Sequence, residues 1–190
     1  MKKTYILLML IATIIISSCN DDEKITPMPV SEIGQSYQGG VIAYVLQPND
    51  IGYIEGEKHG LIAAPNDQSD ASWIVWHSSN DGATGAIGIA VGTGNANTNS
   101  IITLYGNENN AARICYDLVL GGYSDWYLPS QDELYKLYIN RLAIGGFSEG
   151  FYWSSSENYY QYAFVINFND GTYDYNTKYS PGKVRAVRSY

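Results

Sequence analysis

Tyrosine and asparagine side chains gather near the C-terminus, where their types suit recognition rather than catalysis. A tyrosine offers a large ring at low entropic cost, and its hydroxyl both donates and accepts hydrogen bonds. We predict that a ligand contacts the side chains of Tyr159, Tyr160, Tyr162, Val165, Asn167, Asn169, Tyr173, Asp174, Tyr175, Asn176 and Tyr179. The alternative is a tyrosine-rich edge hairpin that binds nothing.

An alternating pattern precedes the Asp170-Gly171 turn signal and is typical of a strand. The rows are Phe164, Ile166 and Phe168 on one side, and Val165, Asn167 and Asn169 on the other. Successive side chains of a strand point to opposite faces, so the first row should be buried and the second exposed. The sequence therefore predicts one packed face and one face free to meet a ligand.

The N-terminus carries a targeting signal. Lys2 and Lys3 precede an apolar run over residues 6–16, which is much shorter than the ~20 residues of a transmembrane helix. We interpret residues 1–18 as a lipoprotein signal peptide, because Ser17-Ser18-Cys19 resembles the bacterial lipobox, in which the cysteine is acylated and becomes the mature N-terminus. Two or more acyl chains hold a protein firmly on a bilayer without spanning it. An ordinary secretory signal with an incidental cysteine is the alternative.

Residues 19–33 form a predicted acidic, proline-containing tether. The acidic cluster at 20–23 resembles the signal that exports some lipoproteins to the outer face of the outer membrane, which would place this chain on the cell surface. A solvated charge run with no targeting role is the alternative. Pro27 and Pro29 favour an extended chain. The net charge of −8 argues against binding to nucleic acids or sulfated glycans, which need a basic patch.

Catalytic groups are few. With Cys19 acylated, Cys115 has no disulfide partner, and its position on a predicted helix face indicates a buried thiol. A nucleophilic cysteine would need a nearby histidine and an electropositive setting, but His59 and His77 lie in neither a triad nor a metal-binding pattern. Calcium takes six or more oxygen ligands, which no loop provides. We therefore predict no catalytic residue, no metal site and no cofactor.

Residues 34–190 are long enough for one domain with a core, and no change in composition divides them. Ser130 and Glu133 form a predicted capping box at the start of a helix. The pattern predicts strands at 39–46, 59–64, 150–156 and 182–190, helices at 106–120 and 129–141, and an irregular loop at 80–99. We expect an α+β fold, an antiparallel sheet and hairpins with two helices packed on one side.

Four segments together resemble the Lcl C-terminal domain family. They are GGYSDWYLPSQDEL at 121–134, YWSSSE at 152–157, AFVINFNDG at 163–171 and KVRAVRS at 183–189. The resemblance implies a C-type-lectin-like fold, in which Val184, Arg185, Val187 and Arg188 finish the sheet. It also implies an extracellular, often lipid-anchored protein that acts in adhesion or glycan binding.

A narrower resemblance is to lipoproteins that diversity-generating retroelements vary by changing adenines, so that Asn codons become Tyr, Asp, Ser, Thr or Val. Many of the predicted ligand-binding residues belong to this set, and they are interspersed with scaffold residues such as Trp153 and Gly171. We expect a surface lipoprotein that binds an unidentified protein or glycan. The alternatives are an envelope enzyme of the sulfatase-modifying type, which shares the architecture, and a structural component of the cell surface.

Overall fold

The computed structural model describes residues 33–69, 74–78, 82–106 and 108–190. The predicted signal peptide, the acylated Cys19 and all but the last residue of the predicted tether lie outside the described residues. Within the described ranges the chain has a mixed α+β fold, with antiparallel strand pairing in three sheets and four helices. None of those helices is long and apolar enough to cross a membrane.

The first sheet contains strands from both the start and the end of the described chain. Its strands lie in the order β1 (Ser36–Tyr37), β2 (Gly40–Val45), β3 (Gly60–Ala63) and β9 (Val187–Ser189). The predictions for β2 and β3 are confirmed. The predicted strand at 182–190 is shorter, because Gly182 belongs to β8 (Pro181–Gly182), which pairs with β4 (Ile74–Val75), and pairing in the first sheet starts only at β9.

The second large sheet contains the predicted recognition segment. Its order is β5 (Phe151–Tyr159), β6 (Tyr162–Asn167) and β7 (Tyr173–Thr177), so β6 is central and β7 lies at the edge. Trp153 pairs with Val165, and Phe164 pairs with Tyr175. Directly paired residues point to the same face of a sheet, so this register decides which predicted contacts share a surface.

The four helices of the described residues cover the sheets. They are α1 (Gly94–Tyr105), α2 (Ala111–Tyr116), α3 (Gln131–Ile139) and α4 (Arg141–Ile144). The irregular loop expected at 80–99 is wrong from Gly94 onward. The start of α1 is poor in helix formers but is held by tertiary contacts: the buried Asn97 side chain donates to the Gly88 carbonyl at 2.6 Å and accepts from the Gly88 amide at 3.1 Å. The helix expected at 106–120 begins later, because Asn110 caps α2 by accepting from the Arg113 amide.

Helices pack on both faces of the β5–β6 hairpin, so the expectation of two helices on one side is wrong. One core places Val165 and Trp153 with side chains of α1 and α2, and the second places Ile166 and Phe168 with side chains of α3. Val165 is 0% exposed, which contradicts its predicted place in the ligand-contacting row. Val165 and Ile166 are adjacent on β6 and are both buried, because helices pack against each face of the strand.

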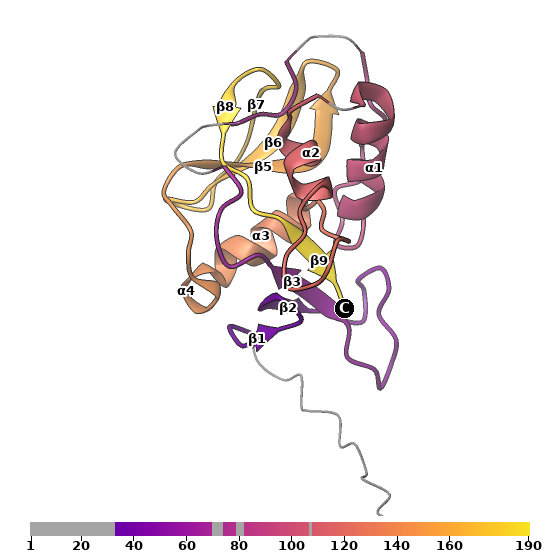
Figure 1. Cartoon of the computed structure of the whole chain (residues 1–190), viewed down its shortest axis with the longest axis vertical. Coiled ribbons are helices and arrows are strands. Elements are labelled where there is room, and N and C mark those ends of the chain that lie inside the picture. Colours follow the sequence, from indigo (N-terminus) through magenta and orange to yellow (C-terminus); the bar gives the residue numbers. More distant parts are fainter. Residues whose placement is uncertain (1–32, 70–73, 79–81, 107) are drawn as a thin grey trace, which may run out of the picture.

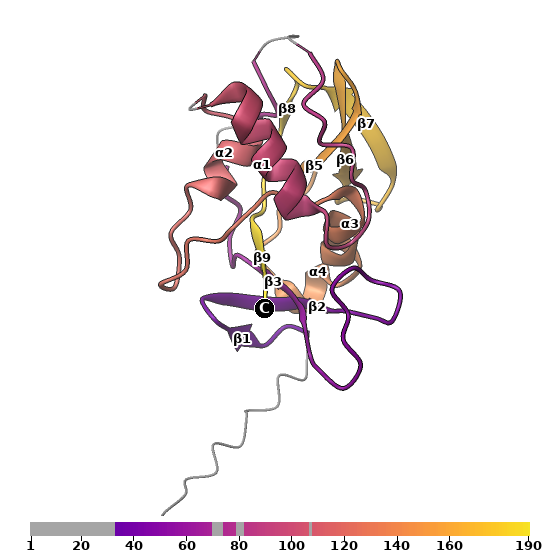
Figure 2. The same cartoon turned by 90° about the vertical axis from the view of Figure 1, so that its right-hand side faces the viewer.

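The two large sheets lie at opposite ends of the molecule. Figures 1 and 2 both place β1, β2 and β3 at one end and β5, β6 and β7 toward the other, with α3 between them. The described chain begins next to β1 (Figure 1). The recognition segment is therefore far from the point at which residues 1–32 join the domain.

Candidate ligand-binding surface

Aromatic side chains gather on one face of the β5–β6–β7 sheet and at its β5–β6 turn. We call Tyr159, Tyr160, Tyr162, Phe164 and Tyr175 the tyrosine face, in which Tyr160 belongs to the turn. Tyr159 pairs with Tyr162, and Phe164 pairs with Tyr175. The rings of Tyr162 and Tyr175 meet edge to face at 5.4 Å, and those of Tyr159 and Tyr160 lie 5.0 Å apart. Tyr159 is 64% exposed and Tyr175 is 52% exposed. These rings are accessible and support one another.

A buried ion pair lies beneath this face. Lys178 is 0% exposed, bonds the Glu157 carboxylate and places its ammonium 4.6 Å from the centroid of the Trp76 ring. The other contacts of the Glu157 carboxylate are to Thr84, whose backbone amide donates to it at 3.0 Å. Glu157 and Lys178 belong to the β5–β6 and β7–β8 segments, so their pairing ties together the chain on either side of the tyrosines.

Other predicted contacts do not join the tyrosine face. Asp174 and Asn176 alternate with Tyr175 on β7 and therefore point to the opposite side of the sheet, where Asp174 pairs with Val165. Asn167 and Asn169 shape the turn at the far end of β6, since Asn167 accepts from the Asn169 amide at 3.0 Å and Asn169 accepts from the Gly150 amide at 3.1 Å. Tyr179 is exposed in the turn after β7.

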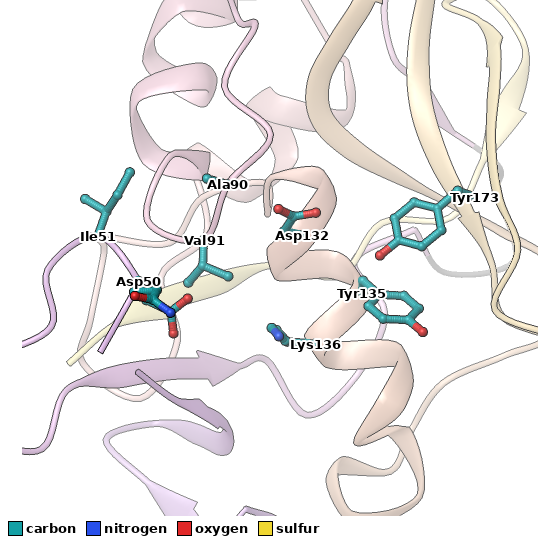
Figure 3. Close-up of a pocket in the computed structure, with 9 residues that line it drawn as sticks. Asp50, Ile51, Ala90, Val91, Asp132, Tyr135, Lys136 and Tyr173 are labelled. Carbon is teal, nitrogen blue, oxygen red and sulfur yellow. The ribbon is translucent and has the colours of Figure 1, made fainter. Parts of the chain in front are cut away.

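Tyr173 opens onto a pocket of about 430 Å³ beside α3. Figure 3 shows Tyr173 and Tyr135 near each other at one end, Asp50 and Ile51 at the other, and Asp132 and Lys136 between them. The rings of Tyr135 and Tyr173 lie 4.8 Å apart. The pocket combines a predicted contact residue with side chains that the sequence did not single out.

Part of this pocket could have been found from the sequence. Asp132, Tyr135 and Lys136 are spaced three and four residues apart on α3 and alternate with the buried Leu134 and Leu137, which is the pattern of an exposed helix face. Asp50 comes from the connection between β2 and β3, far away in the sequence. Nothing local marks it as a neighbour of α3.

Partial burial shifts the pKa of Asp132 and of Tyr173, two residues that line the pocket. Desolvation raises the pKa of Asp132, while Lys136 opposes this shift and Asp50 adds to it. Burial also raises the pKa of Tyr173 to about 12, with smaller contributions from Asp132 and Tyr135. Asp132 and Tyr173 therefore influence each other across the pocket.

Comparison with known proteins identifies the family. The profile of the Lcl C-terminal domain matches residues 64–188, which is more than half of the chain. The chain belongs to the Lcl C-terminal domain family. Membership suggests a role at the cell surface. A comparison with curated proteins finds no match.

Buried arginines hold the last segment of this Lcl C-terminal domain. Arg185 is 0% exposed, pairs with Asp67 at 2.7 Å, and donates to the carbonyls of Ala64 at 2.9 Å and Gly145 at 3.2 Å. Arg188 makes two bonds to Asp125, at 2.7 and 2.8 Å. Both arginines are structural, since each is engaged by a carboxylate.

The capping box of the Lcl C-terminal domain is confirmed and does more than start α3. Glu133 accepts from the amides of Ser130 and Gly92, each at 2.8 Å, and so joins α3 to the loop before α1. A Cβ at Gly94 would stand 2.1 Å from the Glu133 carboxylate, so this position needs glycine. Burial raises the pKa of Glu133 to about 7, against the lowering effect of these amides.

Cys115 is buried in the core of the Lcl C-terminal domain, and desolvation raises the pKa of its thiol. A thiol in such a setting is a poor nucleophile at neutral pH. Across the described ranges, no group of three or more His, Cys, Asp or Glu side chains is placed to hold a metal ion.

Proposed function

We propose that this chain is a ligand-binding lipoprotein of the cell surface, with a C-type-lectin-like fold, whose tyrosine face recognises a protein or a glycan. The observation that carries the proposal is a group of exposed aromatic rings above the buried pair of Lys178 and Glu157. Rings that are already ordered lose little entropy on binding, and tyrosine supplies both contact area and a hydroxyl. The family of the chain is consistent with such a role.

We further propose that an acylated Cys19 anchors the protein in the outer membrane and that the domain faces outward. The anchor joins the domain beside β1, at the end opposite the tyrosine face, which favours contact between that face and a partner outside the cell (Figure 1). Diversification by a retroelement is compatible with the tyrosine face, because substitutions at exposed positions leave the core unchanged. Val165 cannot vary in the same way, since its site is fully buried.

No reaction belongs to this proposal. The thiol of Cys115 is inaccessible, and the arrangement of the tyrosine face offers contact area rather than a general acid and base. Binding is therefore the function that the tyrosine face supports best.

The test replaces Tyr159, Tyr160 and Tyr175, the exposed tyrosines of this face, together by Ala in the full chain. The full chain and the variant are compared on an array of immobilised glycans and of collagen, fibronectin and mucin. We expect the variant to lose at least ~90% of the binding to any surface that retains the unchanged protein, because exposed aromatic anchors dominate binding energy. Its melting temperature should stay within about 2 °C, since exposed side chains contribute little to stability.

Tyr116→Ala is the matched control, because Tyr116 is an exposed tyrosine on α2, outside the tyrosine face. This variant should bind like the unchanged protein. Equal binding by the triple variant and the control would refute the proposed role of the tyrosine face. Strong unfolding of the triple variant would show instead that these rings are part of the core.

A further inference from the structure

The pocket beside α3 is formed in advance, because hydrogen bonds fix its walls. On one side, Asp50 accepts from the Tyr44 hydroxyl and from the Gln47 amide, each at 2.7 Å. On the other, the Asp132 amide donates to the Ile89 carbonyl and the Ser130 hydroxyl donates to the Ala90 carbonyl, each at 2.9 Å. A ligand would therefore meet a cavity that needs little rearrangement.

The two carboxylates of this pocket differ in how they are satisfied. The Asp50 carboxylate already accepts two hydrogen bonds, from the Tyr44 hydroxyl and the Gln47 amide. The Asp132 carboxylate makes no hydrogen bond or ion pair with any residue in the described part of the chain, although it is half-buried. Lys136 does not pair with it, and its ammonium lies 4.9 Å from the centroid of the Tyr44 ring. A half-buried carboxylate without a partner is stabilised by an incoming donor, most of all by a cationic one.

Aromatic rings flank the same carboxylate. Tyr135 and Tyr173 stand together at the end of the pocket beside Asp132 (Figure 3), with their rings 4.8 Å apart. The face of a tyrosine ring attracts cations, and arginine stacks on it while its planar fork binds a carboxylate through two parallel bonds. Asp132 and these rings thus offer the two contacts that a guanidinium group can make at once.

We propose that this pocket takes a cationic side chain, preferably an arginine, from the partner that the tyrosine face binds. The inference rests on the proposed function and names the chemistry of one contact: a protein partner with an exposed arginine that enters between Asp132 and the rings of Tyr135 and Tyr173. The acidic character of the chain, with a net charge of −8, favours the approach of such a partner. Tyr173 lines the pocket and lies on the same side of β7 as Tyr175 of the tyrosine face, so the pocket extends the recognition surface toward α3.

The test titrates the full chain, in detergent micelles, with Nα-acetyl-arginine amide and follows the ring resonances of its tyrosines by NMR. Phe substitutions at Tyr135 and Tyr173 assign the two signals. We expect both signals to shift in a saturable way, with a dissociation constant of the order of 1 mM. Nα-acetyl-citrulline amide has the same shape without the charge and should cause no saturable shift.

Asp132→Asn should weaken arginine amide binding about tenfold, because a charge-assisted pair becomes a neutral contact. Glu55→Gln is the matched control, since Glu55 is an exposed acid on the β2–β3 connection and does not line the pocket. Equal binding of the citrulline analogue, or unchanged binding by Asp132→Asn, would overturn the proposal. So would saturable shifts with glucose or galactose but not with the arginine amide, which would indicate a saccharide pocket. If the pocket fails these tests while the tyrosine variant still loses array binding, the proposed function stands and only this inference falls.

Discussion

At the scale of single residues, β6 shows why an alternating pattern was misleading. The sequence places Val165 and Asn167 in the same row, as if one face of the strand met solvent. In the structure Val165 lies in the core formed with α1 and α2, and Phe164, from the row expected to be buried, is only partly covered. The side chains of β6 that point away from α3 pack instead against a second pair of helices, α1 and α2. Periodicity reports which residues share a face, but the covering element comes from elsewhere in the chain.

Lys178 leads to a prediction at the scale of single residues. Lys178→Met should lower the free energy of unfolding by about 3 kcal/mol or more, because Glu157 would be left as a buried charge with only Thr84 to satisfy it. Urea denaturation at pH 7 measures this change. The double variant Lys178→Met and Glu157→Met should recover most of the loss, since replacing both members of a buried pair is close to neutral.

Lys58→Met is the control for Lys178→Met, because Lys58 is an exposed lysine on the β2–β3 connection. This substitution should change the free energy of unfolding by less than about 0.5 kcal/mol. If Lys178→Met cost no more than Lys58→Met, the ion pair would not hold the chain beneath the tyrosine face. The tyrosine face would then need another support.

At the scale of elements, predictions were right where a local signal fixed the boundary. Ser130 and Glu133 marked the start of α3, and glycine-bounded apolar runs marked β2 and β3. Helix α1 carries no such signal: Thr93 makes no side-chain cap, and the first residues of α1 favour turns. Its position depends on contacts such as that of Asn97 with Gly88, which are visible only in three dimensions. The candidate site follows the same rule: the sequence showed the cluster of tyrosines, but it did not show the pocket beside α3, whose residues come together only in the fold.

The start of α3 should also respond to pH through Glu133. Its pKa rises from 4.5 to about 7 in the folded chain, so the folded state holds this proton more tightly than the unfolded state does. The resulting stabilisation is fully present below about pH 4.5 and is lost as the pH rises through about 7. Between pH 5 and pH 8 the unchanged protein should lose about 2–3 kcal/mol more of its free energy of unfolding than Glu133→Gln.

Urea denaturation of both proteins at several pH values measures the Glu133 effect. The comparison removes the titration of other groups, including Asp132, because both proteins carry them. Glu133→Gln is expected to be less stable overall, since its amide group would face backbone amides that need an acceptor. Only the difference in pH dependence between the two proteins tests the raised pKa of Glu133. Identical pH profiles of the two proteins would contradict that raised pKa.

At the scale of the whole molecule, the layout separates the proposed point of attachment from the proposed recognition surface. The described chain starts beside β1, whereas the tyrosine face belongs to the sheet at the opposite end (Figures 1 and 2). The ion pairs of Arg185 and Arg188 connect the last segment of the chain to the β3 end and to the loop before α3. The proposed recognition surface therefore lies on a domain whose two ends are joined through its core.

This layout can be tested with cysteines introduced on intact cells. The thiol of Cys115 is fully buried, and its raised pKa makes it unreactive, so it should not compete for reagent. In Tyr160→Cys the new thiol lies on the tyrosine face, and in Gln35→Cys it lies beside β1, both at exposed positions. If the anchored domain faces outward, a small membrane-impermeant maleimide should label both variants before lysis. A maleimide carrying a 5 kDa polymer should label Tyr160→Cys several-fold faster, because the membrane and the cell surface crowd the β1 end. Labelling of Tyr160→Cys only after lysis would place the domain inside the envelope. Faster polymer labelling of Gln35→Cys would mean that the tyrosine face is turned toward the membrane.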